Sequence, residues 1–165
     1  MKRQRGFTLI EMLIVIAIIL IIAAVTIPGM TNMKMNANET SAVQSIRAIN
    51  QMEVAYQAAY GGYAESLANL GGADPCTKSA ATACLLDDSL AGGVKAGYNF
   101  VAAGNNPAGG MSTGYVVGAA PVVFDHTGKR MFCSTDKNVI RVDLNANGNT
   151  VPPDGAQCAA FKALP

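Results

Sequence analysis

A long apolar run near the N-terminus limits what this chain can fold into more than any other feature. Residues 7–27 are almost entirely apolar and carry one charge, Glu11. As a helix rising about 1.5 Å per residue, the run is long enough to cross the roughly 30 Å hydrocarbon core of a membrane. Residues 1–6 contain three basic side chains and no acid, which favours a cytoplasmic N-terminus. We therefore expect one transmembrane helix over residues 7–27, with the rest of the chain exported.

The acidic residue within this run needs an explanation. An acid at the centre of a membrane helix costs about 2.5 to 3.5 kcal/mol on insertion scales, and such residues are usually functional. A cleavable secretory signal fits poorly, because its apolar part is shorter and ends in a small-x-small site that the segment AAVTIPG lacks. A plain uncleaved anchor is an alternative, but it leaves Glu11 unexplained.

The motif GFTLIE at residues 6–11 points to a known family. Behind a short basic leader and ahead of an unbroken apolar run, it closely resembles the N-terminus of type IV pilins and pseudopilins. The resemblance implies that a prepilin peptidase cleaves after Gly6, so that residues 1–6 are a leader peptide. It also implies N-methylation of the new terminal amine on Phe7. Glu11 matches the glutamate that the family carries five residues into the mature chain.

A physical reason for Glu11 follows from this cleavage. Cleavage creates an α-ammonium group on Phe7 at the membrane-embedded end of the helix, and a buried cation is costly unless it is paired. Glu11 lies one helical turn away and is the natural partner, either within the chain or in a neighbouring subunit. The family resemblance favours the second arrangement, in which Glu11 and Phe7 of adjacent subunits set the assembly of a filament.

The rest of the chain has the size and charge of one exported domain. The sequence has 165 residues and a formal net charge of +1. No cluster of basic residues follows the apolar run, so no nucleic-acid partner is predicted.

Four cysteines follow the apolar run, and an even number in an exported chain indicates two disulfides. Three pairings are open to them. We favour Cys76 with Cys84, closing a surface loop, and Cys133 with Cys158, tying the C-terminal segment to a strand. The second pair resembles the cysteine-closed C-terminal loop of many pilins.

The remaining segments predict an α+β fold. Residues 28–60 continue the helix as an amphipathic segment, in which Ile46, Ile49, Met52, Tyr56 and Tyr60 recur at three- and four-residue steps and should face a core. Residues 61–96, rich in small residues, should join helix to sheet. Residues 97–165 contain β-branched runs separated by turn residues, which predict an antiparallel sheet packed on the helix and closed by the C-terminal disulfide. This order, with a long N-terminal helix whose first half spans the membrane, is that of the pilin fold.

One loop has the residues of a metal site. Residues 143–154, DLNANGNTVPPD, fit the opening of a calcium loop with an acid at the twelfth position. The ligands would be the side chains of Asp143, Asn145, Asn147 and Asp154 and the carbonyl oxygen of Asn149. Against calcium, the flanks are a strand and a Pro-Pro pair rather than two helices, and Asn-Gly turns are common without metal. A structural calcium is therefore left open, and no other cofactor is predicted.

No grouping of residues predicts an enzyme. His126 is the single histidine, and no nucleophile elbow, phosphate-binding loop or zinc-protease motif is present. We therefore expect no catalytic residues.

The predicted role is structural. The chain is expected to be a bacterial inner-membrane precursor that becomes a subunit of a periplasmic or extracellular type IV pilus-like filament. Its expected partners are other copies of the subunit, prepilin peptidase, the inner-membrane assembly machinery and, before assembly, membrane lipid.

A pseudopilin of a type II secretion system shares the whole N-terminus and is the alternative within the family. A solitary membrane-anchored binding module is the alternative from another class. The sequence does not rank adhesion, motility or DNA uptake.

Overall fold

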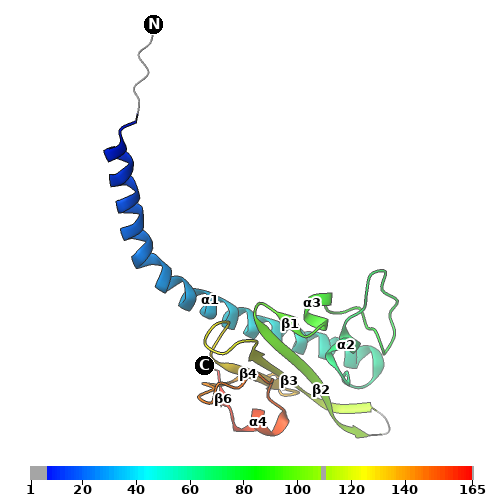
Figure 1. The fold of residues 1–165 in the computed structure, drawn as a ribbon. Helices are drawn as coiled ribbons and strands as arrows, with labels where there is room; N and C mark the ends of the chain where they lie inside the picture. The colour runs from blue at the N-terminus through cyan, green and yellow to red at the C-terminus, as the bar shows by residue number, and fades with distance from the viewer. Residues whose placement is uncertain (1–6, 109–110, 165) are drawn as a thin grey trace. The chain divides into compact units, whose positions relative to one another are not determined.

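The computed structural model describes residues 7–108 and 111–164, with residues 26–29 and 106–108 described by their backbone. The chain divides into two compact units, Met1–Lys34 and Met35–Pro165, and the helix α1 begins in the first and ends in the second. Figure 1 labels the elements along the chain. Their bounds are α1 Leu9–Tyr60, α2 Leu67–Leu70, α3 Asp88–Ala91, β1 Val94–Lys95, β2 Tyr98–Ala108, β3 Met111–Pro121, β4 Met131–Thr135, β5 Arg141–Asp143, α4 Gly155–Ala160 and β6 Lys162–Ala163.

The first unit consists of helix from Leu9 onward. Within the described residues, no single helix satisfies the length and hydropathy expected of a membrane span. The segments Leu9–Val25 and Met30–Tyr60 of α1, taken together, meet the criteria for a membrane span by length and composition alone.

The second unit contains a six-stranded antiparallel sheet in the order β1-β2-β3-β4-β5-β6, so each strand pairs with its neighbours in sequence. β2 and β3 form the longest pair, with Tyr98 opposite Pro121 at one end and Ala108 opposite Met111 at the other. β3 ends at Pro121, since proline has no N–H to donate to a strand ladder. The predicted α+β fold, a long N-terminal helix with an antiparallel sheet, is confirmed.

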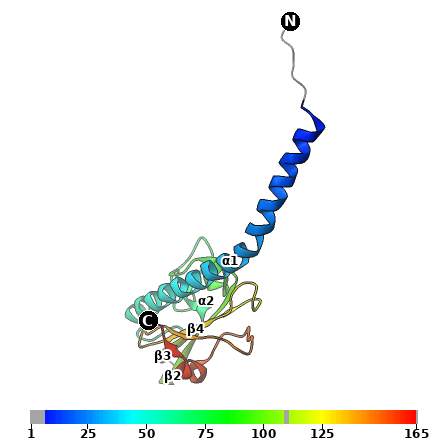
Figure 2. The same cartoon turned by 90° about the vertical axis from the view of Figure 1, so that its left-hand side faces the viewer.

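One face of this sheet packs against residues 35–60 of α1, as Figures 1 and 2 show. Ile46 and Ile49 are fully buried in this contact, whereas Met52 and Tyr60 are partly buried. The stripe predicted from the three- and four-residue spacing is therefore the core-facing side of the helix. The contact is formed by Ala42, Ile46, Ile49 and Tyr56 of α1 and by Tyr98, Phe100, Ala102, Tyr115, Val117, Ala119 and Phe132 of the sheet.

The opposite face of the sheet is covered by the C-terminal segment. Val116, Cys133 and Cys158 form a small buried cluster there, and a disulfide joins Cys133 of β4 to Cys158 of α4, with their Cα atoms 5.8 Å apart. Asp154 caps α4, because its side chain accepts from the backbone N–H of Gln157 at 2.8 Å. Cover on both faces explains why β3 is buried almost continuously rather than alternately.

Residues 61–96, expected as the helix-to-sheet connection, contain α2, α3 and β1. A second disulfide joins Cys76 to Cys84, with their Cα atoms 6.0 Å apart. The backbone N–H groups of Cys84 and Leu85 donate to Gly71 and Leu70. These bonds hold the disulfide loop against the end of α2. Both disulfides in the structure join the pairs favoured from the sequence.

Two glutamates lie in the buried face of α1, and the sequence analysis predicted a role for neither. Glu39 is 4% exposed and accepts hydrogen bonds from the backbone N–H groups of Lys129 at 2.9 Å and Arg130 at 3.1 Å. The Arg130 guanidinium also binds the same carboxylate through Nε and Nη2, each at 2.7 Å. The segment before β4 is thereby held to the helix by a carboxylate whose partners are all in place.

Glu53 is held differently. It is fully buried, and its Oε2 accepts from the backbone N–H of Ala64 at 3.0 Å. Among the described residues, its Oε1 has no hydrogen-bond partner, and neither does Oδ1 of Asn50, one turn earlier on the same helix face. Burial raises the pKa of Glu53 to about 7, although the bond from Ala64 acts to lower it.

Candidate functional site

The candidate functional site is the start of α1, where the predicted processing and assembly residues lie. Phe7 precedes the helix and is 70% exposed. Gly6, the predicted cleavage position, lies outside the described residues. Glu11 lies in the first turn of α1 and is the one charged residue from Leu9 to Met33.

The carboxylate of Glu11 contacts the N-terminus of its own helix. Its Oε2 accepts from the backbone N–H of Thr8 at 3.4 Å and from the Thr8 hydroxyl at 3.3 Å. The Thr8 hydroxyl in turn accepts from the backbone N–H of Glu11 at 3.3 Å. This reciprocal arrangement is a capping box, which satisfies two of the N–H groups left free at a helix start.

The capping box was missed in the sequence analysis, although its signal is present. The pattern T-x-x-E before an apolar run is the usual signature, and residues 8–11 read TLIE. A carboxylate at a helix N-terminus is also favoured by the helix dipole. The hydrogen bonds are long and surround an exposed side chain, so they leave the charge of Glu11 accessible to another molecule.

The helix surface that follows is apolar on every side. Each large apolar side chain from Leu9 to Val25 is between 44% and 84% exposed within the chain. A helix that is apolar all round is normally buried in a protein core or in lipid. An apolar surface of this extent marks a site of contact with a membrane or with other protein. The site can therefore enter lipid, pack against similar helices, and present one acid near its start.

The predicted calcium ligands lie in a loop where several of their oxygens accept hydrogen bonds from N–H groups of the same loop. Asp143 Oδ1 accepts from the backbone N–H of Asn145 at 2.6 Å. The side chain of Asn145 donates to the carbonyl oxygen of Asn149 at 2.8 Å and accepts from the backbone N–H of Asn149 at 2.7 Å. Asp154 serves as the cap of α4.

This arrangement does not fit a calcium ion as it stands. The carbonyl of Asn149 and the side chain of Asn145 would have to exchange their mutual hydrogen bonds for metal bonds. Among the described residues, no three His, Cys, Asp or Glu side chains gather where they could hold a metal ion. Asn147 lies in the turn between the two bonded asparagines.

Comparison with known proteins gives two matches. Residues 1–27 match a sequence family described as "Prokaryotic N-terminal methylation motif". The chain is also similar to the type IV wide pilus major component PilA4 of Thermus thermophilus, with 40% identity over 70 residues. That similarity covers 42% of this chain and 53% of the relative, so the chain matches about half of the relative's length. No solved structure matches the chain. The resemblance predicted from residues 6–11 is thereby confirmed.

Proposed function

We propose that this chain, which carries the N-terminal motif of type IV pilins and pseudopilins, is a structural subunit of a type IV pilus-like filament. The observation that carries the proposal is the start of α1, where an apolar surface exposed on every side begins with a single accessible acid. Membrane lipid would cover this surface before assembly, and the same helix of other copies would cover it in the filament. The proposed role needs no catalytic residue and no cofactor.

The proposed route begins with processing. Prepilin peptidase cleaves between Gly6 and Phe7, the new amine of Phe7 is methylated, and the chain is held in the bacterial inner membrane by residues 7–27. Assembly machinery in that membrane then transfers the subunit into a periplasmic or extracellular filament. The motif matched over residues 1–27 supports the processing step.

In the filament, we assign Glu11 to the α-ammonium group of Phe7 in a neighbouring subunit. Within one chain the Glu11 carboxylate has long hydrogen bonds to Thr8. Exchanging these bonds for a charged partner therefore sacrifices little hydrogen-bond energy. An ammonium group packed among apolar helices without a partner would be much more costly. The pair therefore favours the assembled state over the separate subunits.

The pilus subunit is favoured over a pseudopilin by two features, although both share the N-terminal motif. One is the similarity to a component of a type IV pilus, and the other is the disulfide that closes the C-terminal segment. Imaging of sheared cell-surface material with antibody to this chain tests the choice. Fibres that contain the chain support the pilus. Their absence, together with a loss of protein secretion when the gene is deleted, would support the pseudopilin.

Two substitutions separate the charge of Glu11 from its capping role. Glu11→Gln keeps an oxygen that can complete the capping box, whereas Glu11→Val removes both cap and charge. We expect both variants to be inserted and cleaved, and both to accumulate in the membrane without forming fibres. The measurement is the ratio of the protein in sheared fibres to that in membranes, with each variant as the sole subunit. Normal assembly of Glu11→Gln would show that the cap, not the charge, matters.

A further inference from the structure

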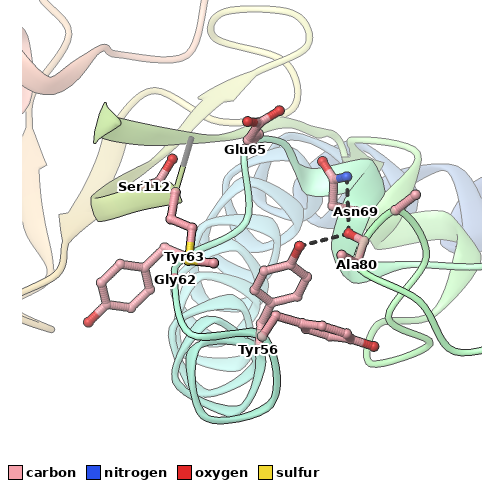
Figure 3. Close-up of a pocket in the computed structure, with 10 residues that line it drawn as sticks. Tyr56, Gly62, Tyr63, Glu65, Asn69, Ala80 and Ser112 are labelled. Carbon is pink, nitrogen blue, oxygen red and sulfur yellow. Dashed lines mark hydrogen bonds between the residues drawn. The ribbon is translucent and has the colours of Figure 1, made fainter. Parts of the chain in front are cut away.

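A pocket of about 370 Å³ lies where α1 ends and the chain turns toward α2. Figure 3 shows Tyr63 and Ser112 on one side, Tyr56, Asn69 and Ala80 on the other, and Glu65 at the rim between them. Its volume lies within the range of small-molecule sites, which begins at about 300 Å³. The pocket lies wholly within the second unit and is far in sequence from the assembly residues.

The aromatic walls of the pocket are held in place by hydrogen bonds. The Tyr56 hydroxyl donates to the carbonyl oxygen of Ala80 at 2.7 Å, and the same oxygen accepts from the Asn69 side chain at 3.4 Å. The ring centroids of Tyr56 and Tyr60 are 4.7 Å apart. Because the Tyr56 hydroxyl is already bonded, the residue offers its ring rather than its hydroxyl to a ligand.

The other wall is fixed independently of the first. The backbone N–H of Tyr63 donates to the carbonyl oxygen of Ser112 at 2.9 Å, which ties the chain after α1 to β3. The Tyr63 ring contacts the ring of buried Tyr115, with centroids 4.8 Å apart. Tyr56 and Tyr60 of α1 and the anchored segment at Tyr63 thus line one pocket, and little ordering is needed when a ligand enters.

The charge of the pocket has one sign. Glu65 is the one ionisable acid among the lining residues, and they include no lysine, arginine or histidine. Tyrosine rings present a negative face to a ligand. Burial raises the pKa of Tyr56, and the nearby Tyr60, Glu53 and Glu65 raise it further, which agrees with a negative local field. A cation is therefore attracted by both the walls and the rim, whereas an anion is repelled.

We propose that this pocket binds an alkylammonium group through the rings of Tyr56 and Tyr60 and the carboxylate of Glu65. Aromatic side chains around a carboxylate are the usual means of binding such a cation, since the positive charge is stabilised by ring faces and its alkyl part by apolar contact. The group belongs either to a small free amine or to a lysine side chain of another protein chain. This site goes beyond the proposed filament role, which uses none of these residues.

The first test uses the full chain in detergent and n-butylammonium chloride as the probe. Ring resonances of the tyrosines are followed by NMR during titration, with sodium chloride at matched ionic strength and 1-pentanol as a neutral molecule of similar shape. We expect saturable shifts with butylammonium alone. Glu65→Gln and Tyr60→Leu should each weaken binding by about threefold to tenfold, in line with modest cation–ring and surface-charge energies. Asp88→Asn, on α3 and outside the lining, should not.

Two arms distinguish the sources of the group. A free amine is favoured if butylammonium binds but Nα-acetyl-lysine amide does not. A lysine side chain is favoured if both bind and a carbodiimide crosslink in assembled material joins the Glu65 peptide to a lysine peptide. Equal shifts with 1-pentanol, or saturable binding of methyl glucoside without binding of butylammonium, would overturn the proposal. So would unchanged affinity in Glu65→Gln together with Tyr60→Leu.

Discussion

Residues 9–34 and residues 35–60 belong to the same helix, yet the burial of their apolar side chains differs. In the first part, every large apolar side chain from Leu9 to Val25 is exposed within the chain. In the second, Ile46 and Ile49 are fully buried against the sheet. Helix formation is common to both, so the difference lies in the supply of a partner. The second part packs against the sheet of its own chain, whereas the large apolar side chains of the first remain exposed within the chain.

The acids of the two parts differ in the same way. Glu11 is exposed and bonded weakly to its own helix start. Glu39 is buried and its carboxylate is bound by Arg130 and by two backbone N–H groups. An acid that is already satisfied inside the domain cannot direct assembly, whereas an accessible one can. The comparison therefore places the second part in the folded domain and agrees with the assembly role proposed for the first.

The largest effect should come from separating the two parts. A chain of residues 31–165 keeps the whole buried face of α1 together with a few preceding residues. We expect it to fold cooperatively, with a free energy of unfolding within about 1 kcal/mol of the same domain in the full chain, since most changes away from a core are small. It should partition entirely into the soluble fraction and form no fibres. Circular dichroism melts and sedimentation check both points, and a non-cooperative melt would show that the two parts are not independent.

The next largest effect concerns the disulfides that close the domain. By the chain-entropy relation, the Cys133–Cys158 bond, which closes the longer loop, should stabilise the domain by about 3.5 kcal/mol, and the Cys76–Cys84 bond by about 2.5 kcal/mol. Replacing both Cys133 and Cys158 by serine should therefore destabilise the domain more than replacing both Cys76 and Cys84. The first replacement also puts two hydroxyls into a buried cluster. Denaturant unfolding of the two double variants measures the difference.

Peptide mapping without reduction is the control for this prediction. It should recover Cys133 linked to Cys158 and Cys76 linked to Cys84. A peptide joining Cys76 to either C-terminal cysteine would contradict the pairing on which the comparison of the two variants rests.

The sequence predicted those features that depend on local pattern. The helix stripe at Ile46, Ile49 and Tyr56 follows from spacing, and the strands follow from β-branched runs and turn residues. α4 was not predicted, although its capping pair Asp154 and Gln157 is visible in the sequence, because a short segment has too few periodic positions to indicate a helix.

The buried acids show where sequence reasoning stops. Glu39 and Glu53 lie at the same spacing as the apolar stripe, but acids are rarely buried and are normally assigned to a solvated face. What makes Glu39 acceptable is Arg130, some ninety residues later, and nothing local predicts that contact. The Glu11 cap could have been predicted, since it depends on residues 8–11 alone.

The two buried glutamates should respond in opposite directions to the same substitution. Glu39→Gln removes the charge that binds Arg130, and we expect it to destabilise the domain by about 2 kcal/mol, less than for a fully buried pair because the arginine is partly exposed. Glu53→Gln removes a charge that has no ionic partner among the described residues, and at pH 8 it should stabilise the domain by a similar amount.

The pH dependence distinguishes them further. In the unfolded chain Glu53 loses its proton near pH 4.5, whereas in the folded domain its pKa is about 7. The protonated carboxyl therefore contributes stability below pH 4.5, and this contribution is lost as the pH rises to about 7, by an amount on the order of 3 kcal/mol. Urea unfolding at several pH values should show this loss in the parent and not in Glu53→Gln. Glu65→Gln, an exposed glutamate nearby, is the matched control and should keep the parent's pH dependence.

The smallest effect is expected at the loop of residues 143–154. If calcium held this loop, a concentration one hundred times the dissociation constant would stabilise the domain by about 2.7 kcal/mol, and a chelator would remove that stabilisation. The loop instead closes through two hydrogen bonds between Asn145 and Asn149, with Asp143 bonded to the backbone N–H of Asn145. We therefore expect EDTA to leave the melting temperature unchanged, while Asn145→Ala lowers it in the presence and absence of EDTA alike.

A melting temperature that falls with EDTA and recovers with added calcium would mean that these oxygens exchange their hydrogen bonds for metal bonds. Asp143→Ala should then abolish the response, since it removes the carboxylate at the first position of the loop.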